Sequence, residues 1–238
     1  MRVVNFGNKI INTYAIKLDQ GWLLIDTGYS QQFQSFIKKL RKHKIRISDI
    51  SYVFLTHAHD DHAGFLDELL KRSDAKVILH KKAVQRLKIG QNSFEGGCTS
   101  YLALAFCYMM KLIGKGEHKF PPVNRPDRYI ILTDVVQKNI EDKLSCKILH
   151  LPGHTKDSMG IFFEDRSLFC GDSAMNGFPS LSKITIWIEN LEEYKESWKT
   201  ILKNNPLKIY PSHGKPFLKK DLEKNINKID NIKLYPLK

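Results

Sequence analysis

Three histidines and two aspartates fall within six residues, His57 to His62, of a chain that has nine histidines in total. Side chains two positions apart on an extended segment point the same way, so His57 and His59 can bind one metal ion. Asp61 and His62 follow at once and can reach a second ion. Imidazole and carboxylate ligands suit zinc and, less selectively, iron, manganese or nickel. The pattern therefore favours a metal site over a solvated polar loop.

Three more residues of ligand type occur later in the chain. His154 follows the apolar run CKILHL, Asp172 follows RSLFC, and His213 follows LKIY. Each run is typical of a strand, and a loop at a strand end is a common place for functional side chains. Taken singly, each residue could be a loop histidine or a capping aspartate. Together with the first cluster they supply five imidazoles and two carboxylates, a count that suits two metal ions.

Strands and helices are mixed along the whole chain, with apolar runs typical of strands and apolar residues at helical spacing. The predicted strands are 13–19, 22–28, 50–57, 75–80, 129–134, 144–151, 158–165, 166–172 and 207–213. The predicted helices are 31–44, 63–72, 81–88, 190–205, capped by Asn190, and 218–229. Two strand-rich halves with helices outside predict a layered sandwich of two sheets.

The net charge of +13 is the unusual bulk property of the 238 residues. It is compatible with an anionic substrate, a membrane surface or nucleic acid. The basic residues are dispersed and do not alternate with aromatic residues, which is typical of a solubilising surface and does not favour nucleic acid. No apolar run reaches 18 residues, so no membrane-spanning helix is expected.

Compartment is inferred from the N-terminus and the cysteines. The first 19 residues lack the long apolar region of a secretion signal. The four cysteines form no CxxC pair, which indicates free, reduced thiols; they are Cys98, Cys107, Cys146 and Cys170. A cytoplasmic protein is therefore expected.

In its motifs the chain resembles the metallo-β-lactamase-fold hydrolase superfamily, nearest to the lactonase and glyoxalase II-like branches. The resemblance rests on five motifs in order: DTG at 26–28, THAHDDHAG at 56–64, PGHT at 152–155, GDSA at 171–174 and SHG at 212–214. It implies an α+β fold, a four-layer αββα sandwich, formed by a single domain over residues 1–238. A helical insertion at about 93–128 would interrupt that domain.

The resemblance also implies a set of metal ligands. His57, His59 and His154 would hold one ion, and Asp61, His62 and His213 the other. Asp172 would bridge them, and Asp26 would orient ligands rather than bind metal. The implied cofactors are two Zn²⁺, with Fe or Mn as alternatives, and a metal-bridging hydroxide would attack an ester, lactone or thioester. Asp61 would orient that hydroxide and accept a proton.

The chain departs from each familiar branch. Acyl-homoserine lactonases usually carry tyrosine where this chain has Met175, and glyoxalase II enzymes add a helical C-terminal domain. True metallo-β-lactamases are exported and generally lack the bridging aspartate. The sequence leaves open a phosphodiesterase, a single-iron persulfide dioxygenase, or a metal-bearing sensor with little turnover.

The segment from Tyr101 to Ile113 is apolar almost all round and too short to span a bilayer. It is either a helix that fills the core, a contact in a homodimer, or a cap over the metal site. As a cap, it would offer Phe106, Met109 and Met110 to the apolar tail of a small-molecule substrate.

Overall fold

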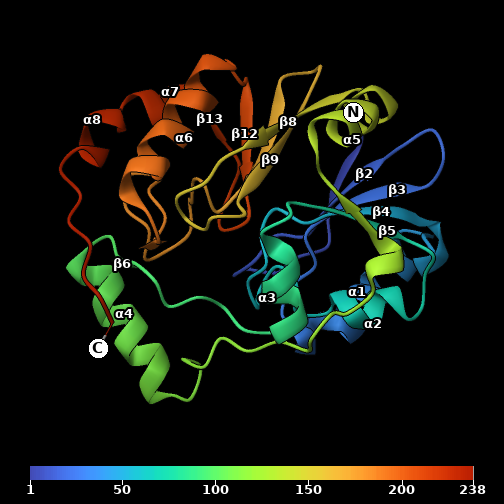
Figure 1. Cartoon of the computed structure of the whole chain (residues 1–238), viewed down its shortest axis with the longest axis horizontal. Helices are drawn as coiled ribbons and strands as arrows, with labels where there is room; N and C mark the ends of the chain where they lie inside the picture. Colours follow the sequence, from blue (N-terminus) through green and yellow to red (C-terminus); the bar gives the residue numbers. More distant parts are fainter. Residues whose placement is uncertain (238) are drawn as a thin grey trace. The chain divides into compact units, whose positions relative to one another are not determined.

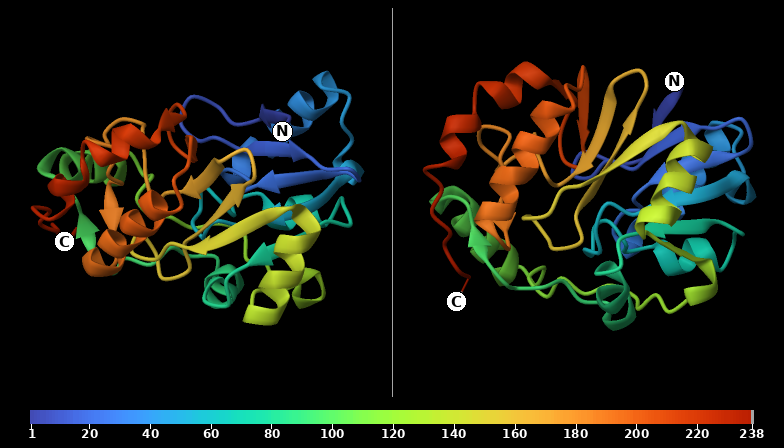
Figure 2. Two further views of the ribbon diagram at one scale, coloured as in Figure 1. Left: turned by 90° about the horizontal axis from the view of Figure 1, so that it is seen from above. Right: turned by 45° about the horizontal axis from the view of Figure 1, so that its top comes forward.

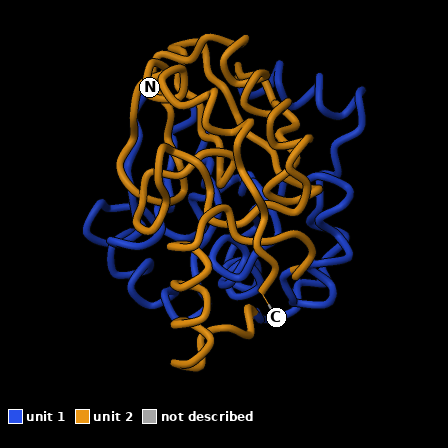
Figure 3. Tube along the Cα trace, turned by 90° about the vertical axis from the view of Figure 1, so that its left-hand side faces the viewer, with its two compact units in different colours: residues 1–92, 119–144 blue, residues 93–118, 145–238 orange. Residues whose placement is uncertain are grey.

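The computed structural model describes residues 1–237, which divide into two compact units (Figure 3). Unit 1 comprises residues 1–92 and 119–144, and unit 2 comprises the remainder. Each unit contains one large sheet with helices on one face. The prediction of a single domain with an insertion at 93–128 stays a prediction.

Unit 1 is built on a six-stranded sheet in the order β1-β2-β3-β4-β5-β7 (Figure 1). Its strands are β1 Val3–Asn5, β2 Tyr14–Lys17, β3 Trp22–Ile25, β4 Ile50–Phe54, β5 Lys76–Leu79 and β7 Tyr129–Ile131. The first three strands are antiparallel, and β3, β4, β5 and β7 run parallel. Because β3 and β4 are parallel neighbours, the residues that follow them emerge at the same end of the strands.

Helices α1 Phe33–Lys42, α2 Leu66–Leu70 and α3 Ala83–Ile89 bury their apolar sides on one face of this sheet (Figures 1 and 2). Unit 1 also contains helix α5 Asp134–Leu144, whose Lys143 ammonium lies over the Tyr52 ring of β4, and 3₁₀ turns η1 Ser30–Gln32, η2 Ile47–Asp49 and η3 Pro126–Arg128. Helix α1 contributes Phe33, Phe36 and Leu40 to a core that also takes side chains from α2 and α3. The helical spacing in the sequence therefore predicted α1 correctly, whereas α5 was missed.

Unit 2 is built on a five-stranded sheet in the order β13-β12-β10-β9-β8. Its strands are β8 Cys146–His150, β9 Met159–Phe163, β10 Ser167–Gly171, β12 Lys208–Pro211 and β13 Phe217–Leu218. Only β10 and β12 are parallel. The loops after β10 and β12 therefore leave the sheet at the same end of the strands.

Helices α6 Leu191–Lys203, α7 Lys219–Glu223 and α8 Ile226–Ile229 pack on one face of the unit 2 sheet. Asn190 caps α6, because its side chain accepts hydrogen bonds from the N–H groups of Glu192 and Glu193. The prediction of one helix over 218–229 is wrong. The helix is interrupted near Asn225, between α7 and α8. The Asn225 side chain donates a hydrogen bond to the Asp221 carbonyl and so satisfies an acceptor at the end of α7.

Each large sheet is apolar on both faces. In unit 1 the face away from α1, α2 and α3 carries buried Leu23, Ile25 and Phe54. In unit 2 the corresponding face carries buried Ile161 and Phe169. Two apolar faces are what an inner layer of the predicted sandwich requires.

A two-stranded ribbon and one helix complete unit 2. The ribbon pairs β6 Gly97–Cys98 with β11 Trp187–Ile188, and helix α4 Tyr101–Leu112 follows β6. Ala103 is the one buried residue of α4. The alternative that this helix fills the core is therefore wrong. No helix within residues 1–237 is long and apolar enough to cross a membrane.

Candidate functional site

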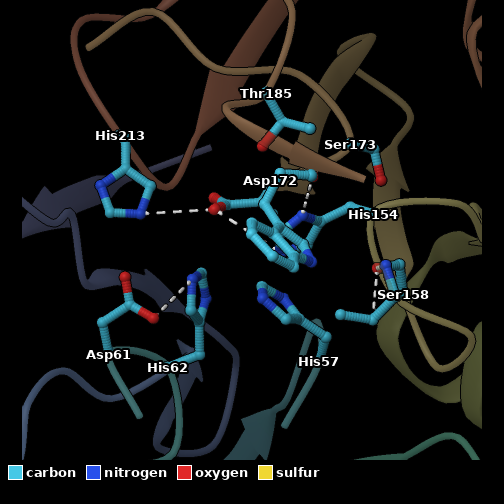
Figure 4. Close-up of polar contacts among 12 residues, drawn as sticks. His57, Asp61, His62, His154, Ser158, Asp172, Ser173, Thr185 and His213 are labelled. Carbon is cyan, nitrogen blue, oxygen red and sulfur yellow. Dashed lines mark hydrogen bonds and ion pairs between the residues drawn. The ribbon is translucent and has the colours of Figure 1, made fainter. Parts of the chain in front are cut away.

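The histidine cluster of unit 1 lies in the loop that follows β4. His57, His59 and His62 are all buried, and Asp61 is only slightly exposed. Figure 4 shows the side chains of His57, Asp61 and His62. The ring of His57 lies 3.9 Å from that of His62 and 4.6 Å from that of His59, between centroids. Asp61 Oδ1 lies 3.5 Å from His62 Nε2. The loop thus gathers three imidazoles and a carboxylate.

Asp26, at the end of β3, holds this loop from behind. Its carboxylate accepts hydrogen bonds from the N–H and the hydroxyl of Thr56, each at 2.7 Å, and lies 2.8 Å from His62 Nδ1. Asp26 is fully buried and has a φ of 57°, a left-handed conformation in which aspartate is one of the more tolerated residues. The Thr56 hydroxyl also lies 3.1 Å from His57 Nδ1. A single carboxylate therefore sets the orientation of His62 directly and of His57 through Thr56.

Two further contacts fix the path of the loop. The N–H and the hydroxyl of Thr27 both donate to the His62 carbonyl at 2.7 Å. Asn92 exchanges hydrogen bonds with Asp60, through the Asp60 N–H at 2.8 Å and the Asp60 carboxylate at 2.7 Å. Sequence reasoning missed Asn92, because nothing in its local sequence indicates a partner 32 residues away.

Unit 2 brings His154, Asp172 and His213 together from three separate strand ends (Figure 4). Asp172 directly follows β10, His213 lies just past β12, and His154 lies in the loop after β8. Asp172 Oδ2 is 3.4 Å from His213 Nε2 and 3.9 Å from His154 Nε2. One carboxylate oxygen therefore faces two imidazole nitrogens, and all three side chains are buried.

His154 is oriented by the main chain of the β6–β11 ribbon. Its Nδ1 lies 2.8 Å from the Trp187 carbonyl oxygen. The preceding Gly153 carbonyl accepts hydrogen bonds from the N–H groups of Glu189 and Asn190, which ties the histidine loop to the start of α6. Sequence reasoning missed Trp187, because a backbone carbonyl leaves no signal in residue type.

Asp172 is anchored through its neighbour and through a buried helix face. The Ser173 carbonyl accepts a hydrogen bond from Trp198 Nε1 at 2.8 Å, and Trp198 is fully buried in α6. On the same helix, burial raises the pKa of Tyr194, whose hydroxyl accepts from the Thr185 N–H. Residues of α6 thus connect the core of unit 2 to the backbone around Asp172.

The donor set in each unit fits a zinc-like cation. His62 Nδ1 and His154 Nδ1 each face a protein acceptor, so a proton on Nδ1 leaves the Nε2 lone pair for a metal. The separations of 3.4 and 3.9 Å from Asp172 to His213 and His154 are long for direct hydrogen bonds. Two ligand atoms at about 2.1 Å from one tetrahedral ion lie about 3.4 Å apart. These imidazole and carboxylate groups could therefore hold metal ions.

The side chains predicted to contact substrate lie on α4 in unit 2. Met109 is about half exposed at 49%, whereas Phe106 and Met110 are partly buried. The Phe106 ring meets that of Phe178 edge to face, with centroids 6.4 Å apart. Their contact with a substrate stays a prediction.

The order and spacing of these ligand-bearing loops can be compared with known proteins. The family model of the metallo-beta-lactamase superfamily matches residues 7–213. The chain belongs to the metallo-beta-lactamase superfamily. The match begins between β1 and β2 of unit 1 and ends at His213 in unit 2, so it includes every candidate ligand.

Individual superfamily members are similar to the chain at low identity. A "Beta-lactamase-like protein 2 homolog" of Caenorhabditis elegans is 26% identical over 220 residues, which are 90% of this chain and 58% of that protein. A hydroxyacylglutathione hydrolase of Psychromonas ingrahamii is 24% identical over 160 residues, which are 61% of this chain and 46% of that protein. The chain thus spans about half the length of the curated relatives it matches.

Solved structures show the same fold. An archaeal metallo-beta-lactamase superfamily protein from Sulfolobus tokodaii matches with a TM-score of 0.62 and 22% identity, over 92% of this chain and 80% of that one. The predicted fold class, the α+β metallo-β-lactamase sandwich, is thereby confirmed. The superfamily consists generally of hydrolases that bind metal, and the chain has histidine and aspartate groups able to do so.

Proposed function

We propose that the chain is a hydrolase whose site combines the ligand sets of the two units around two metal ions. His57, His59 and His154 would hold the first ion, Asp61, His62 and His213 the second, and Asp172 would bridge them. One observation carries this proposal: within unit 2, a single Asp172 oxygen faces the Nε2 atoms of two buried histidines. Membership of a metal-binding superfamily supports it.

Two bound zinc ions would supply a water of lowered pKa and would polarise the bond under attack. The remaining steps belong to the chain itself. Asp61 would accept the proton released during hydrolysis at a carboxylate oxygen, because it is the more exposed of the two ligand carboxylates, at 13% against 9% for Asp172. Asp26 and the Trp187 carbonyl would keep His62 and His154 oriented throughout turnover.

The proposed substrate is an ester, lactone or thioester with an apolar tail. Helix α4 supports this choice, because large apolar side chains remain exposed along it, among them Leu102, Met109 and Leu112. Similarity to a hydroxyacylglutathione hydrolase also supports an acyl-transfer reaction over phosphodiester cleavage. The dispersed positive charge would raise the encounter rate with an anionic substrate, an effect that salt weakens.

Metal analysis and a substrate panel test the proposal together. Protein purified without chelator is expected to contain two transition-metal ions per chain, with zinc expected before iron or manganese. It is also expected to hydrolyse at least one substrate from a panel of esters, thioesters, lactones and phosphodiesters. A chelator should abolish turnover, and zinc should restore it.

Each result leads to a distinct conclusion. A single tightly held equivalent that never rises on added zinc contradicts the two-ion site. Turnover of phosphodiesters alone replaces the acyl substrate with a phosphate ester. Two metals with tight ligand binding and no turnover identify a sensor of the same fold and overturn the hydrolase assignment.

A further inference from the structure

Two of the four cysteines, which lie nine residues apart and form no CxxC motif, meet in unit 2. Cys98 Sγ in β6 donates a hydrogen bond to Cys107 Sγ in α4, with the two sulfur atoms 3.5 Å apart. Both are free thiols. A disulfide needs about 2.05 Å between its sulfur atoms, so the two sulfur atoms would have to approach each other by about 1.5 Å.

The two thiols differ in reactivity. The hydrogen bond from Cys98 lowers the pKa of Cys107, and nearby His118 adds to this effect against the opposing effect of burial. The same hydrogen bond and burial raise the pKa of Cys98. Cys98 is fully buried, whereas Cys107 is partly exposed. This arrangement is typical of an oxidant-sensitive cysteine that has a resolving partner beside it.

The two cysteines do not form a metal site by themselves. Within residues 1–237, the clusters of side chains able to ligate a metal consist of histidine and aspartate and contain no cysteine. Two thiols without a third ligand form an incomplete site for zinc, which takes four ligands in structural centres. Oxidation is therefore the chemistry that the pair fits.

The two thiols lie on elements with different restraints. Cys98 is held on both sides, because it pairs with Trp187 in β11 and exchanges backbone hydrogen bonds with Tyr235, each at 2.9 Å. Helix α4 is less restrained, with Ala103 as its one buried residue, and Gly114 follows it in open space. The helix is thus the element that would move toward the strand.

We propose that Cys98 and Cys107 form a reversible disulfide in response to hydroperoxides and thereby fasten α4 to the β6–β11 ribbon. The Cys107 thiolate attacks a peroxide oxygen, the O–O bond breaks, and Cys107 becomes a sulfenic acid as hydroxide leaves. The Cys98 sulfur then attacks the Cys107 sulfur, the S–O bond breaks, and water leaves. The two thiols together lose two electrons, which reduce hydrogen peroxide to two waters.

The disulfide has a path to the candidate ligands of unit 2. Cys98 pairs directly with Trp187, and the Trp187 carbonyl orients His154. Fastening α4 to this ribbon changes the restraint on the carbonyl that positions the imidazole. This consequence rests on the proposed function, whereas formation of the disulfide does not.

Mass spectrometry of the full, metal-loaded chain tests disulfide formation without any turnover. After exposure to hydrogen peroxide, alkylation and digestion with chymotrypsin, which can cleave after Tyr101 and Phe106, peptides joined through Cys98 and Cys107 are expected, and dithiothreitol should separate them. Cys146 is also partly exposed, so Cys146→Ser provides a matched control that should retain the disulfide. Cys98→Ser should stop at a sulfenic acid on Cys107, detected as a dimedone adduct.

Two results of this experiment would contradict formation of the disulfide. Recovery of Cys98 and Cys107 as separately alkylated thiols, or oxidation of Cys146 before Cys107, overturns the proposal. If the disulfide forms and a substrate is known, turnover is compared before and after dithiothreitol. A change of several-fold in kcat/KM that dithiothreitol reverses supports coupling to His154. Unchanged kcat/KM removes the coupling and leaves the disulfide in place.

Discussion

The two units supply their candidate ligands in contrasting ways. In unit 1, four ligands come from six consecutive residues of one loop, and a buried side chain, Asp26, orients two of them, His62 directly and His57 through Thr56. In unit 2, three ligands come from the ends of three strands, and a backbone carbonyl, that of Trp187, orients His154. One set depends on a local motif, and the other depends on the fold.

This difference determines how each set responds to substitution. A side chain that orients a ligand can be removed by changing one residue. A backbone carbonyl survives any change of its own side chain that preserves the local fold. Substitution of Asp26 is therefore expected to disturb the orientation of ligands in unit 1. Substitution of Trp187 is expected to leave the orientation of His154 in unit 2 unchanged.

The largest expected effect comes from the carboxylate that faces two histidines. Asp172→Ala removes a proposed shared ligand, so metal content should fall from about two ions to about one. Activity should drop by more than the roughly 10–100-fold typical of residues that only orient ligands. The fold should survive, because Asp172 lies just past the C-terminal end of β10 rather than among the apolar side chains of the core, and circular dichroism checks this. Near-normal turnover of Asp172→Ala would contradict the ligand assignment.

Asp26→Asn should give the next largest effect. The amide retains one acceptor for the Thr56 N–H but turns a donor toward the Thr56 hydroxyl and His62 Nδ1, where Asp26 now accepts. Metal affinity or activity should fall by about 10–100-fold. Metal titration and kcat/KM measure the effect, with exposed Asp165→Asn as the matched control. Equal behaviour of the two variants would show that Asp26 does not orient the loop.

Trp187→Ala should have a much smaller effect on the site. The carbonyl that faces His154 remains, and the loss is limited to side-chain packing and the hydrogen bond from Nε1 to the Glu95 carbonyl. That bond contributes about 1 kcal/mol to the free energy of unfolding. Urea unfolding should detect this loss while metal content stays at the wild-type value. A fall in metal affinity as large as that of Asp26→Asn would remove the proposed contrast between the units.

The same contrast explains what the sequence could predict. The cluster from His57 to His62 and the cap at Asn190 are visible because the residues that interact are neighbours in sequence. Helix α1 is visible because its apolar residues recur at helical spacing and become buried. Local rules of this kind predicted most strands and the two sheets with their helices.

Features made by distant residues were not predictable from local patterns. The ribbon of β6 and β11 joins segments about 90 residues apart, with two residues in each strand, too few to show an alternating pattern. The meeting of Cys98 and Cys107 depends on where that ribbon places α4. The break at Asn225 was missed because the apolar spacing on either side of it continues as in one helix.

The smallest effect concerns specificity, which the proposal assigns to unit 2 through α4. If an acyl tail contacts Phe106, Met109 and Met110, each buried methylene contributes about 0.8 kcal/mol, or about fourfold in kcat/KM. The specificity constant should then rise with chain length until the apolar surface is covered. Met110→Ala should flatten that rise and leave metal content unchanged, because no proposed ligand is altered.

The control for this prediction lies on the same helix. Leu112 is 87% exposed, so Leu112→Ala should preserve the chain-length profile if the tail follows the partly buried side of α4. A flat profile in the wild-type protein would instead favour a homodimer contact for residues 101–113, because burial already excludes the core. Unit 2 would then supply ligands without supplying specificity, and the substrate would have to be sought among small polar esters or phosphodiesters.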